Sequence, residues 1–214
     1  MKTFYSPVHT GHAPKEEFEQ GRLSPAVEIP ERALRVLSRL EERKVGPVVT
    51  PSIFGDEPIL RVHDSAFVKF LTDAHSGWRA KYPKDDADAI PSTWPARGLR
   101  DRRHGDIESQ LGSYCFDTAT PIVKGTSAAA RTAVDTALSA AQAVHSGERS
   151  AFALARPPGH HASGDVYGGY CYLNNVAIAA QWLADKGMKP AILDVDYHHG
   201  NGTQTIFYDR NDVL

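Results

Sequence analysis

Two short apolar runs in the second half of the chain, with a helix between them, constrain the fold more than any other feature. Residues 151–155 and 191–195 each have the composition of a buried strand. Residues 174–186 have helical apolar spacing, and Gly187 ends that helix. A strand, a helix and a returning strand form a β-α-β unit. We therefore expect an α/β fold with a mainly parallel sheet flanked by helices.

Further strands and helices are expected from the same kinds of pattern. Residues 6–28 are polar, contain several prolines and show no apolar period, so we expect them to be irregular. The additional expected elements are strands at 3–5 and 47–50, a helix at 30–44, a short helix capped by Asp64, and a long helix from Thr126 or Ser127 to about residue 145.

Residues 79–113 interrupt the regular pattern. They contain three prolines, three glycines and charges of both signs, with no apolar period. A segment of this length within a compact domain is usually functional or disordered. We interpret it as a long loop insertion in a single domain that spans residues 1–214.

Charge and cysteine content exclude several classes of partner. The net charge is −2 at pH 7, which favours neither nucleic acid nor an anionic membrane surface as a partner. The cysteines Cys115 and Cys171 do not form a disulfide framework. The chain has no signal-peptide pattern and no apolar run near the roughly 18 residues of a membrane span. We expect a soluble cytoplasmic protein.

Polar clusters follow both strands of the β-α-β unit. The first cluster, residues 156–161, ends in His160 and His161, and the second begins at Asp194 and contains Asp196 and His198. Ligands bind beyond the carboxyl ends of strands in open α/β sheets. Loops on near-neighbour strands lie within about 5–10 Å of each other. We therefore expect the two clusters to face one pocket.

The residue types of these clusters suit metal-assisted hydrolysis. Asp196 and His198 offer one oxygen and one nitrogen ligand, a combination that suits zinc or another divalent transition metal. Asp194 shares their direction on an extended chain, but it could instead orient a histidine. Two consecutive histidines suit acid–base chemistry, because histidine titrates near neutral pH. Alternative readings are a solvated loop and a proline turn with incidental histidines.

Three long motifs resemble the histone deacetylase family. They are residues 156–161 (Arg-Pro-Pro-Gly-His-His), 168–175 (Gly-Gly-Tyr-Cys-Tyr-Leu-Asn-Asn) and 194–204. The acetylpolyamine amidohydrolase branch is the most similar, because Glu17 and the Glu28-x-Pro30-x-Arg32 pattern also match it. The resemblance covers essentially the whole chain. It implies the three-layer arginase–deacetylase fold and hydrolysis of N-acetylated amines.

The resemblance also implies catalytic and metal-binding roles. His161 matches the general base and acid, which Asn201 would support. His160 matches an electrostatic partner, which Asp194 would support. The implied metal ligands are Asp196 and His198, for Zn2+ or Fe2+.

Substrate and monovalent cation sites are implied in the same way. Tyr170 and Gly169 would line the substrate channel, and Glu17 and Glu108 would recognise a polyamine cation. In this branch the 79–113 segment contributes to a homodimer and to substrate entry. A structural K+ or Na+ would bind at Asp194, Asp196 and His198, and a second near Phe207, Arg210 and Val213.

Two groups that the resemblance requires have no counterpart in the expected place. The family uses a third metal ligand, an aspartate, and a tyrosine that hydrogen-bonds the oxyanion. Here 20 residues follow Asp194, and no further strand-and-loop cluster fits among them. His63, Asp106 and Glu108 are not expected to substitute. We therefore expect that the C-terminal part of the domain is missing and that the chain alone has little activity.

Three alternatives stay open at this point. The first is a dimanganese ureohydrolase of the arginase or agmatinase type, although the tandem histidines and the single Asp-x-His spacing argue against it. The second is an inactive fragment that acts as a binding module. The third is a deacetylase whose substrate is acetyl-lysine in proteins and not a small acetylated amine.

Overall fold

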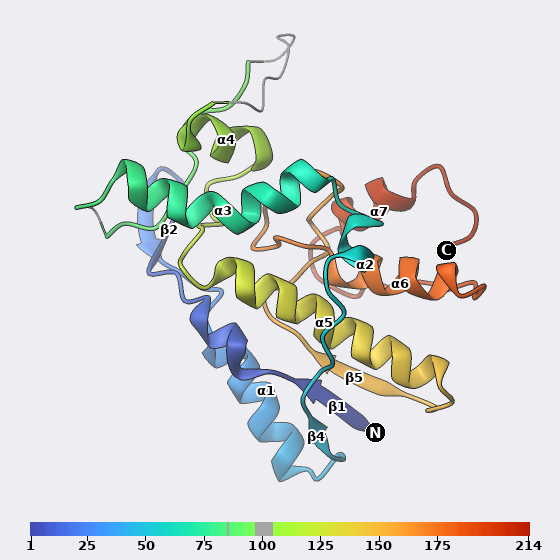
Figure 1. Ribbon diagram of the computed structural model, residues 1–214. Helices are drawn as coiled ribbons and strands as arrows, with labels where there is room; N and C mark the ends of the chain where they lie inside the picture. Colours follow the sequence, from blue (N-terminus) through green and yellow to red (C-terminus); the bar gives the residue numbers. More distant parts are fainter. Residues whose placement is uncertain (85, 97–104) are drawn as a thin grey trace.

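A short parallel sheet forms the centre of the computed structural model, which describes residues 1–84, 86–96 and 105–214 (Figure 1). Strand β1 (Lys2–Tyr5) lies between β4 (Val48–Val49) and β5 (Ala151–Leu154), and it pairs with both in parallel. The strands expected at 3–5, 47–50 and 151–155 are therefore confirmed, and so is the parallel sheet.

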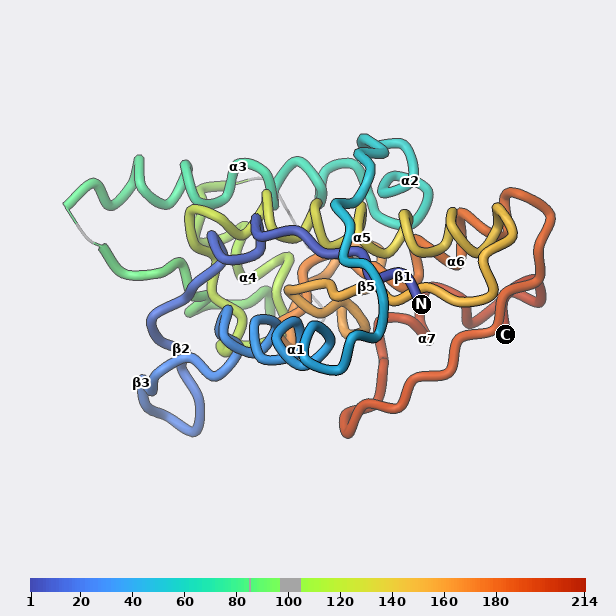
Figure 2. Tube along the Cα trace, turned by 90° about the horizontal axis from the view of Figure 1, so that it is seen from below, coloured from blue at the N-terminus to red at the C-terminus, as the bar shows by residue number. Residues whose placement is uncertain are grey.

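Helices cover both faces of this sheet (Figure 2). Helix α1 (Glu31–Glu42) lies on one side, and α5 (Thr126–His145) lies on the other. Buried alanines of α5, Ala129 and Ala133 among them, let the helix approach the strands closely. Helix α6 (Asn175–Asp185) packs beside α5. The expected helices at 30–44, 126–145 and 174–186 are confirmed.

Helices α2 (Glu57–Leu60), α3 (Ser65–Lys81) and α4 (Ile107–Tyr114) surround an aromatic core. Helix α7 (Asn201–Phe207) packs against α6. Phe70 of α3 stacks on Tyr114 of α4 with ring centroids 4.6 Å apart. Tyr167 stacks on Tyr172 at 5.6 Å, and both are fully buried. These two tyrosines hold the turn between them, which reaches the candidate site described below.

One of the two predicted helix caps is confirmed, and the other is wrong. Asp64 caps α3 as predicted, because its carboxylate accepts hydrogen bonds from Ala66 N at 2.8 Å and Phe67 N at 3.3 Å. Neither Thr126 nor Ser127 caps α5, which begins after Gly125. The Thr126 hydroxyl instead accepts a hydrogen bond from Val123 N and contacts buried His12.

The predicted strand at 191–195 is wrong. These residues belong to no strand, and Leu193 and Val195 are 88% and 85% exposed. Among the described residues the sheet order is β4-β1-β5, and residues 191–195 pair with none of these strands, so they form no ladder. Two backbone hydrogen bonds hold the start of the segment, from Ile192 N to Leu214 O at 2.7 Å and from Leu214 N to Pro190 O at 3.0 Å.

The N-terminal region is more regular than its composition indicates. Residues 6–28 contain a 3-10 helix, η1 (Pro7–Gly11), and an antiparallel hairpin of β2 (Glu16–Glu19) and β3 (Arg22–Pro25). Gln20 and Gly21 form its turn with φ of 51° and 79°. The strands are short and rich in charge, so they give little apolar alternation to recognise.

The interpretation of 79–113 as one long loop differs from the structure at both ends. Its start belongs to α3, and its end belongs to α4. Residues 97–104 lie outside the described residues. Within the part of the chain that is described, none of the helices combines the length and the apolar character needed to cross a bilayer.

Candidate active site

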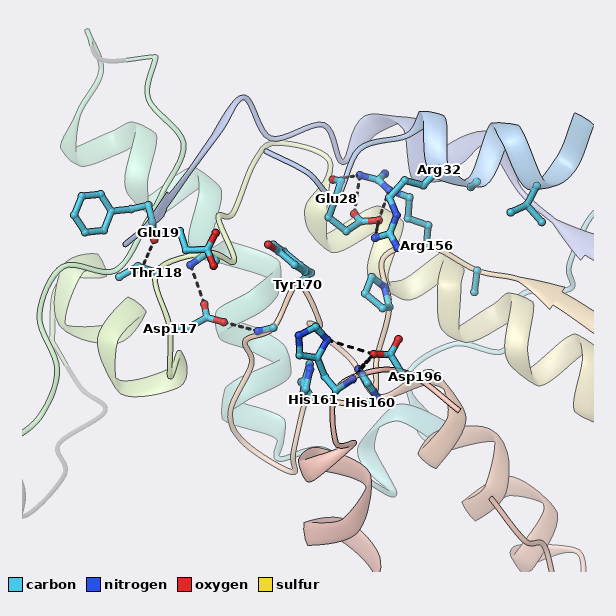
Figure 3. Close-up of a pocket in the computed structure, with 18 of the residues that line it drawn as sticks. Glu19, Glu28, Arg32, Asp117, Thr118, Arg156, His160, His161, Tyr170 and Asp196 are labelled. Atoms are coloured by element: carbon cyan, nitrogen blue, oxygen red, sulfur yellow. Dashed lines mark hydrogen bonds and ion pairs between the residues drawn. The ribbon is translucent and has the colours of Figure 1, made fainter. Parts of the chain in front are cut away.

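A cavity of about 680 Å³ lies at the carboxyl end of β5 (Figure 3). His160 and His161 reach it from the loop after β5, and Asp196 and His198 reach it from the segment before α7. Tyr170 lines a third side, from the turn between the stacked tyrosines. The two polar clusters that lie about 35 positions apart in the sequence thus share one pocket, as predicted.

His160 is paired with a carboxylate. Its Nδ1 lies 2.8 Å from Oδ2 of Asp194, while the other oxygen of Asp194 accepts a hydrogen bond from Asp196 N at 3.0 Å. Partial burial acts to raise the pKa of Asp194, but these hydrogen bonds and the charge of His160 outweigh it and hold that pKa below its usual value. Gly200 packs on this pair, where a Cβ would come within 2.4 Å of Oδ2.

His161 is paired with an amide instead. Its Nδ1 lies 2.5 Å from Oδ1 of Asn201, the first residue of α7. Because an amide oxygen accepts but does not donate, this contact places the proton on Nδ1 and leaves Nε2 with a free lone pair. The two imidazole rings lie side by side with centroids 4.1 Å apart. One pocket thus holds two histidines with chemically different partners.

Asp196 and His198 are spaced as two ligands of one metal ion. Oδ1 of Asp196 lies 3.4 Å from Nδ1 of His198. Two atoms that are each about 2.0–2.1 Å from a tetrahedral zinc ion are about 3.3–3.4 Å apart, so this spacing fits. Hydrogen bonding from His198 N is the largest influence that lowers the pKa of Asp196, which favours the anionic ligand. Among the residues that the structure describes, no group of three His, Cys, Asp or Glu side chains could hold a metal.

Tyr170 forms an aromatic wall in a constrained conformation. It has a φ of 64°, follows Gly169 at 57°, and its backbone N–H donates to Thr120 Oγ1 at 2.9 Å. Gly169 lies against His161, where a Cβ would come within 2.2 Å of the ring. A non-glycine residue in the left-handed region costs of order 1–3 kcal/mol, and such residues cluster at functional sites.

Asp117 holds this turn, and sequence reasoning missed it. Its carboxylate accepts hydrogen bonds from Ala119 N, Thr120 Oγ1 and Gly169 N. Figure 3 shows Asp117 beside the cavity. Asp followed by a Thr-Ala-Thr sequence is a signal for a local Asx turn, which could have identified the first of these contacts.

A comparison with protein families assigns the chain. The model of the histone deacetylase domain matches residues 26–214. The chain belongs to the histone deacetylase family. It is 48% identical to acetylpolyamine amidohydrolase 1 of Pseudomonas aeruginosa and 44% identical to acetylpolyamine amidohydrolase of Mycoplana ramosa. Each match covers 100% of this chain and 62% of the relative, so the chain spans less than two thirds of the length of these relatives.

Solved structures of the family confirm the predicted arginase–deacetylase fold. An acetylpolyamine aminohydrolase from Burkholderia pseudomallei superposes with a TM-score of 0.93 at 39% identity, over 100% of this chain and 61% of that one. The HD domain of HDA15 has a TM-score of 0.73 at 27% identity, with 51% of its chain covered.

The two glutamates predicted to bind a substrate cation do not line the cavity. Glu17, on β2, is 1% exposed, and it accepts hydrogen bonds from Tyr170 Oη at 3.1 Å and Val27 N at 3.3 Å. Glu108, on α4, pairs with Lys81 at 2.6 Å and also accepts a hydrogen bond from Tyr82. The structure thus brings neither carboxylate into the cavity with the histidines.

A buried ion pair lies beneath the histidine loop. Arg156 donates through Nε to Glu28 Oε1 at 2.9 Å, and its Nη1 donates to His9 O at 2.8 Å. Burial raises the pKa of Glu28, and the charges of Arg156 and Arg32 oppose that rise. Sequence reasoning used these residues as motif matches and did not predict the pair.

The residues expected near a second monovalent cation lie at the end of α7 and in the turn after it. Phe207 and Val213 are buried, and Arg210 N donates to the Phe207 carbonyl at 3.0 Å. The Arg210 guanidinium pairs with Asp212. The role of this turn as a K+ or Na+ site stays a prediction.

Proposed function

We propose that the cavity is part of the active site of a metal-dependent deacetylase that hydrolyses the amide of N-acetylated amines. The observation that carries the proposal is the pair of adjacent histidines, one bonded to Asp194 and the other to Asn201, beside Asp196 and His198. The relatives named acetylpolyamine amidohydrolase support a small acetylated amine as substrate. Acetyl-lysine in proteins is the rival substrate.

Asp196 and His198 would hold Zn2+ or Fe2+, which would polarise the acetyl carbonyl and lower the pKa of a bound water. His161 accepts the water proton at Nε2, because Asn201 occupies its Nδ1. The water oxygen then bonds to the carbonyl carbon, and the C–N bond breaks. The leaving nitrogen takes a proton from the histidine pair, which gives acetate and a free amine. Asp194 accepts a hydrogen bond from Nδ1 of His160 and so fixes the orientation of that ring during these transfers.

The remaining walls of the cavity exclude water and orient the substrate. Tyr170 and Gly169 form one side of the cavity, where the acetylated end of the substrate would lie. Asp117 keeps these two residues in place through Gly169 N and Thr120. Orientation of a reactant against fixed catalytic groups lowers the barrier by removing translational and rotational freedom before reaction.

The complete activity requires groups beyond those described. We propose that the chain alone turns over little substrate, because its described residues offer two metal ligands and a catalytic zinc site uses three. A structural K+ or Na+, a homodimer and a cytoplasmic location remain our predictions. Both cysteines are buried and free, which supports a reducing compartment.

Equilibrium dialysis against Zn2+, combined with an acetate-release assay, tests the proposal. We expect one zinc ion per chain, and loss of binding in the His198→Ala variant. The matched control is His199→Ala, because His199 is the next residue but contacts Gln204 outside the cavity. Two bound metal ions with urea release would favour the ureohydrolase alternative. Unchanged zinc binding in His198→Ala would contradict the proposed site.

A further inference from the structure

Two glutamates of the hairpin strand β2 have opposite environments. Residues two apart on a strand point to the same side, so Glu17 and Glu19 share one face of β2. Glu17 is buried, whereas Glu19 is exposed and lines the cavity. The difference arises because Tyr170 and the hairpin cover Glu17, while Glu19 lies next to the turn at Gln20 and Gly21.

Both carboxylate oxygens of Glu17 already have partners. Oε1 accepts from the Tyr170 hydroxyl, and Oε2 accepts from Val27 N of the chain that follows the hairpin. An incoming ammonium group would have to break these contacts and lose its own hydration in a site that is 1% exposed. Glu17 is therefore built to hold Tyr170 in place.

The carboxylate of Glu19 faces the cavity on the Tyr170 side (Figure 3). Its negative charge contributes to the raised pKa of the Tyr170 hydroxyl, after burial and Glu17. The exposed cation of the cavity wall, Arg32, lies at the opposite end of the drawn group (Figure 3). One end of the cavity thus attracts a positive group, and the other end repels it.

We infer that Glu19 is the carboxylate that binds the distal ammonium of an acetylated diamine or polyamine, and that Glu17 acts through Tyr170 as a positioning residue. The inference rests on the proposed function, because it assigns the cation contact of the same cavity. An exposed ion pair of this kind changes affinity by about three- to fivefold and weakens as salt screens it.

A pair of matched ligands separates the cation contact from the rest of the site. N-acetylputrescine carries an ammonium group at its far end, and N-pentylacetamide has the same length with a methyl group in its place. NMR titration of the 214-residue chain at low salt gives the ratio of the two affinities. We expect a preference of about three- to fivefold for N-acetylputrescine. The preference disappears in Glu19→Gln and is retained in Glu19→Asp.

The matched control is Glu16→Gln, because Glu16 is an equally exposed glutamate of β2 that does not line the cavity. It should leave the ratio unchanged. Glu17→Gln should weaken both ligands by the same factor, about two- to tenfold. In the Tyr170→Phe background it should have no further effect, since the contact through which it acts is already gone.

The outcomes distinguish this assignment from the function on which it rests. An unchanged ratio in Glu19→Gln, or loss of the cation preference in Glu17→Gln, overturns the assignment while the proposed function stands. Additive effects of Glu17→Gln and Tyr170→Phe overturn the positioning role. If neither ligand binds the wild-type chain, the proposed function fails together with the assignment.

Discussion

The loop of residues 156–161 and the segment of residues 191–199 meet at one cavity, but different forces hold them. The loop begins at Arg156, which is 3% exposed and anchored to Glu28 and to His9 O. In the segment, Val195 and Tyr197 are 85% and 96% exposed. Its local order comes from short turns, in which each aspartate accepts a backbone hydrogen bond from the residue two positions later.

This difference separates the stable part of the site from the part that opens most easily. Regions with few buried contacts and exposed backbone open locally at low free-energy cost. The histidine loop is tied to the core, whereas Asp196 and His198 depend on the contact between Asp194 and His160 and on any ligand that binds there. Asn174 links the residues that follow the two regions, since its side chain donates to Ala162 O and to Thr203 Oγ1 of α7.

The largest effect is expected when the buried anchor of the loop is broken. Glu28→Gln leaves Arg156 buried without its carboxylate, which should lower the free energy of unfolding by about 3–5 kcal/mol. Urea denaturation measures this. The matched control is Arg32→Gln, which removes the exposed partner of the same carboxylate and should cost about 1 kcal/mol or less. Equal losses in the two variants would contradict the anchoring role.

Low pH should weaken the hydrogen bond between His63 and Asn174 and lower the free energy of unfolding by an amount comparable to that of the Glu28 change. His63 Nε2 accepts a hydrogen bond from Asn174 N, and burial lowers the pKa of His63 from 6.5 to about 4. The unfolded chain therefore binds more protons between these values. This contribution to stability is complete above about pH 6.5 and is lost as pH falls toward 4, in total about 3 kcal/mol. Urea unfolding at a series of pH values measures this. Between pH 6.5 and 4 the free energy of unfolding should fall less in His63→Gln than in the wild-type chain, and an equal fall would show that His63 is not the group responsible.

A single methyl group in the turn beside His161 should have an intermediate effect. Gly169→Ala places a Cβ against the imidazole and strains a φ of 57°, at a cost of about 2–3 kcal/mol. Gly187→Ala is the control, because its φ is 79° but no atom lies within 4 Å of the added Cβ. It should cost about 1 kcal/mol. Thermal unfolding gives both values, and similar losses would show that the His161 contact is unimportant.

The smallest expected effect comes from metal bound to the exposed segment. Zn2+ at ten times its dissociation constant should stabilise the folded chain by about 1.4 kcal/mol. Hydrogen exchange should slow in residues 191–199 and stay unchanged in the loop of residues 156–161. Asp196→Asn should reduce the protection, whereas Asp209→Asn, which lies beyond α7, should not. Equal slowing of exchange in both regions would contradict the proposed difference in their local stability.

The sequence predicted the parts of the fold that local pattern determines. The strands at β1 and β5 and the helices α1 and α6 follow from apolar spacing and from breakers at their ends. Residues 191–195 have the same apolar character as a buried strand, but a strand needs a neighbour to pair with, and composition does not report whether one is present. The β2–β3 hairpin was missed for the opposite reason, since its pairing does not depend on an apolar face.

Some contacts of the candidate site were also predicted from the sequence, and others were not. The contacts of His160 with Asp194 and of His161 with Asn201 match the pairs that the family motif implied. Asp117 was not predicted, because it acts on Gly169 from 52 positions away. The pair of Arg156 and Glu28 spans 128 positions and consists of common surface residue types. The pair is strong because both residues are buried, and the sequence around Arg156 and Glu28 does not indicate that burial.

The two carboxylate oxygens of Asp194 have different roles, one in the local backbone turn and one in the contact with His160. One oxygen closes the turn onto Asp196 N, and the other faces His160. Asparagine also closes such turns through its single side-chain oxygen, but it would present an N–H donor to His160 in place of an acceptor. The loop can therefore keep its path while the histidine is forced into the other tautomer. At position 194 the backbone conformation and the tautomer of His160 can therefore change independently. A relative with asparagine here would retain the fold of this site after losing its chemistry.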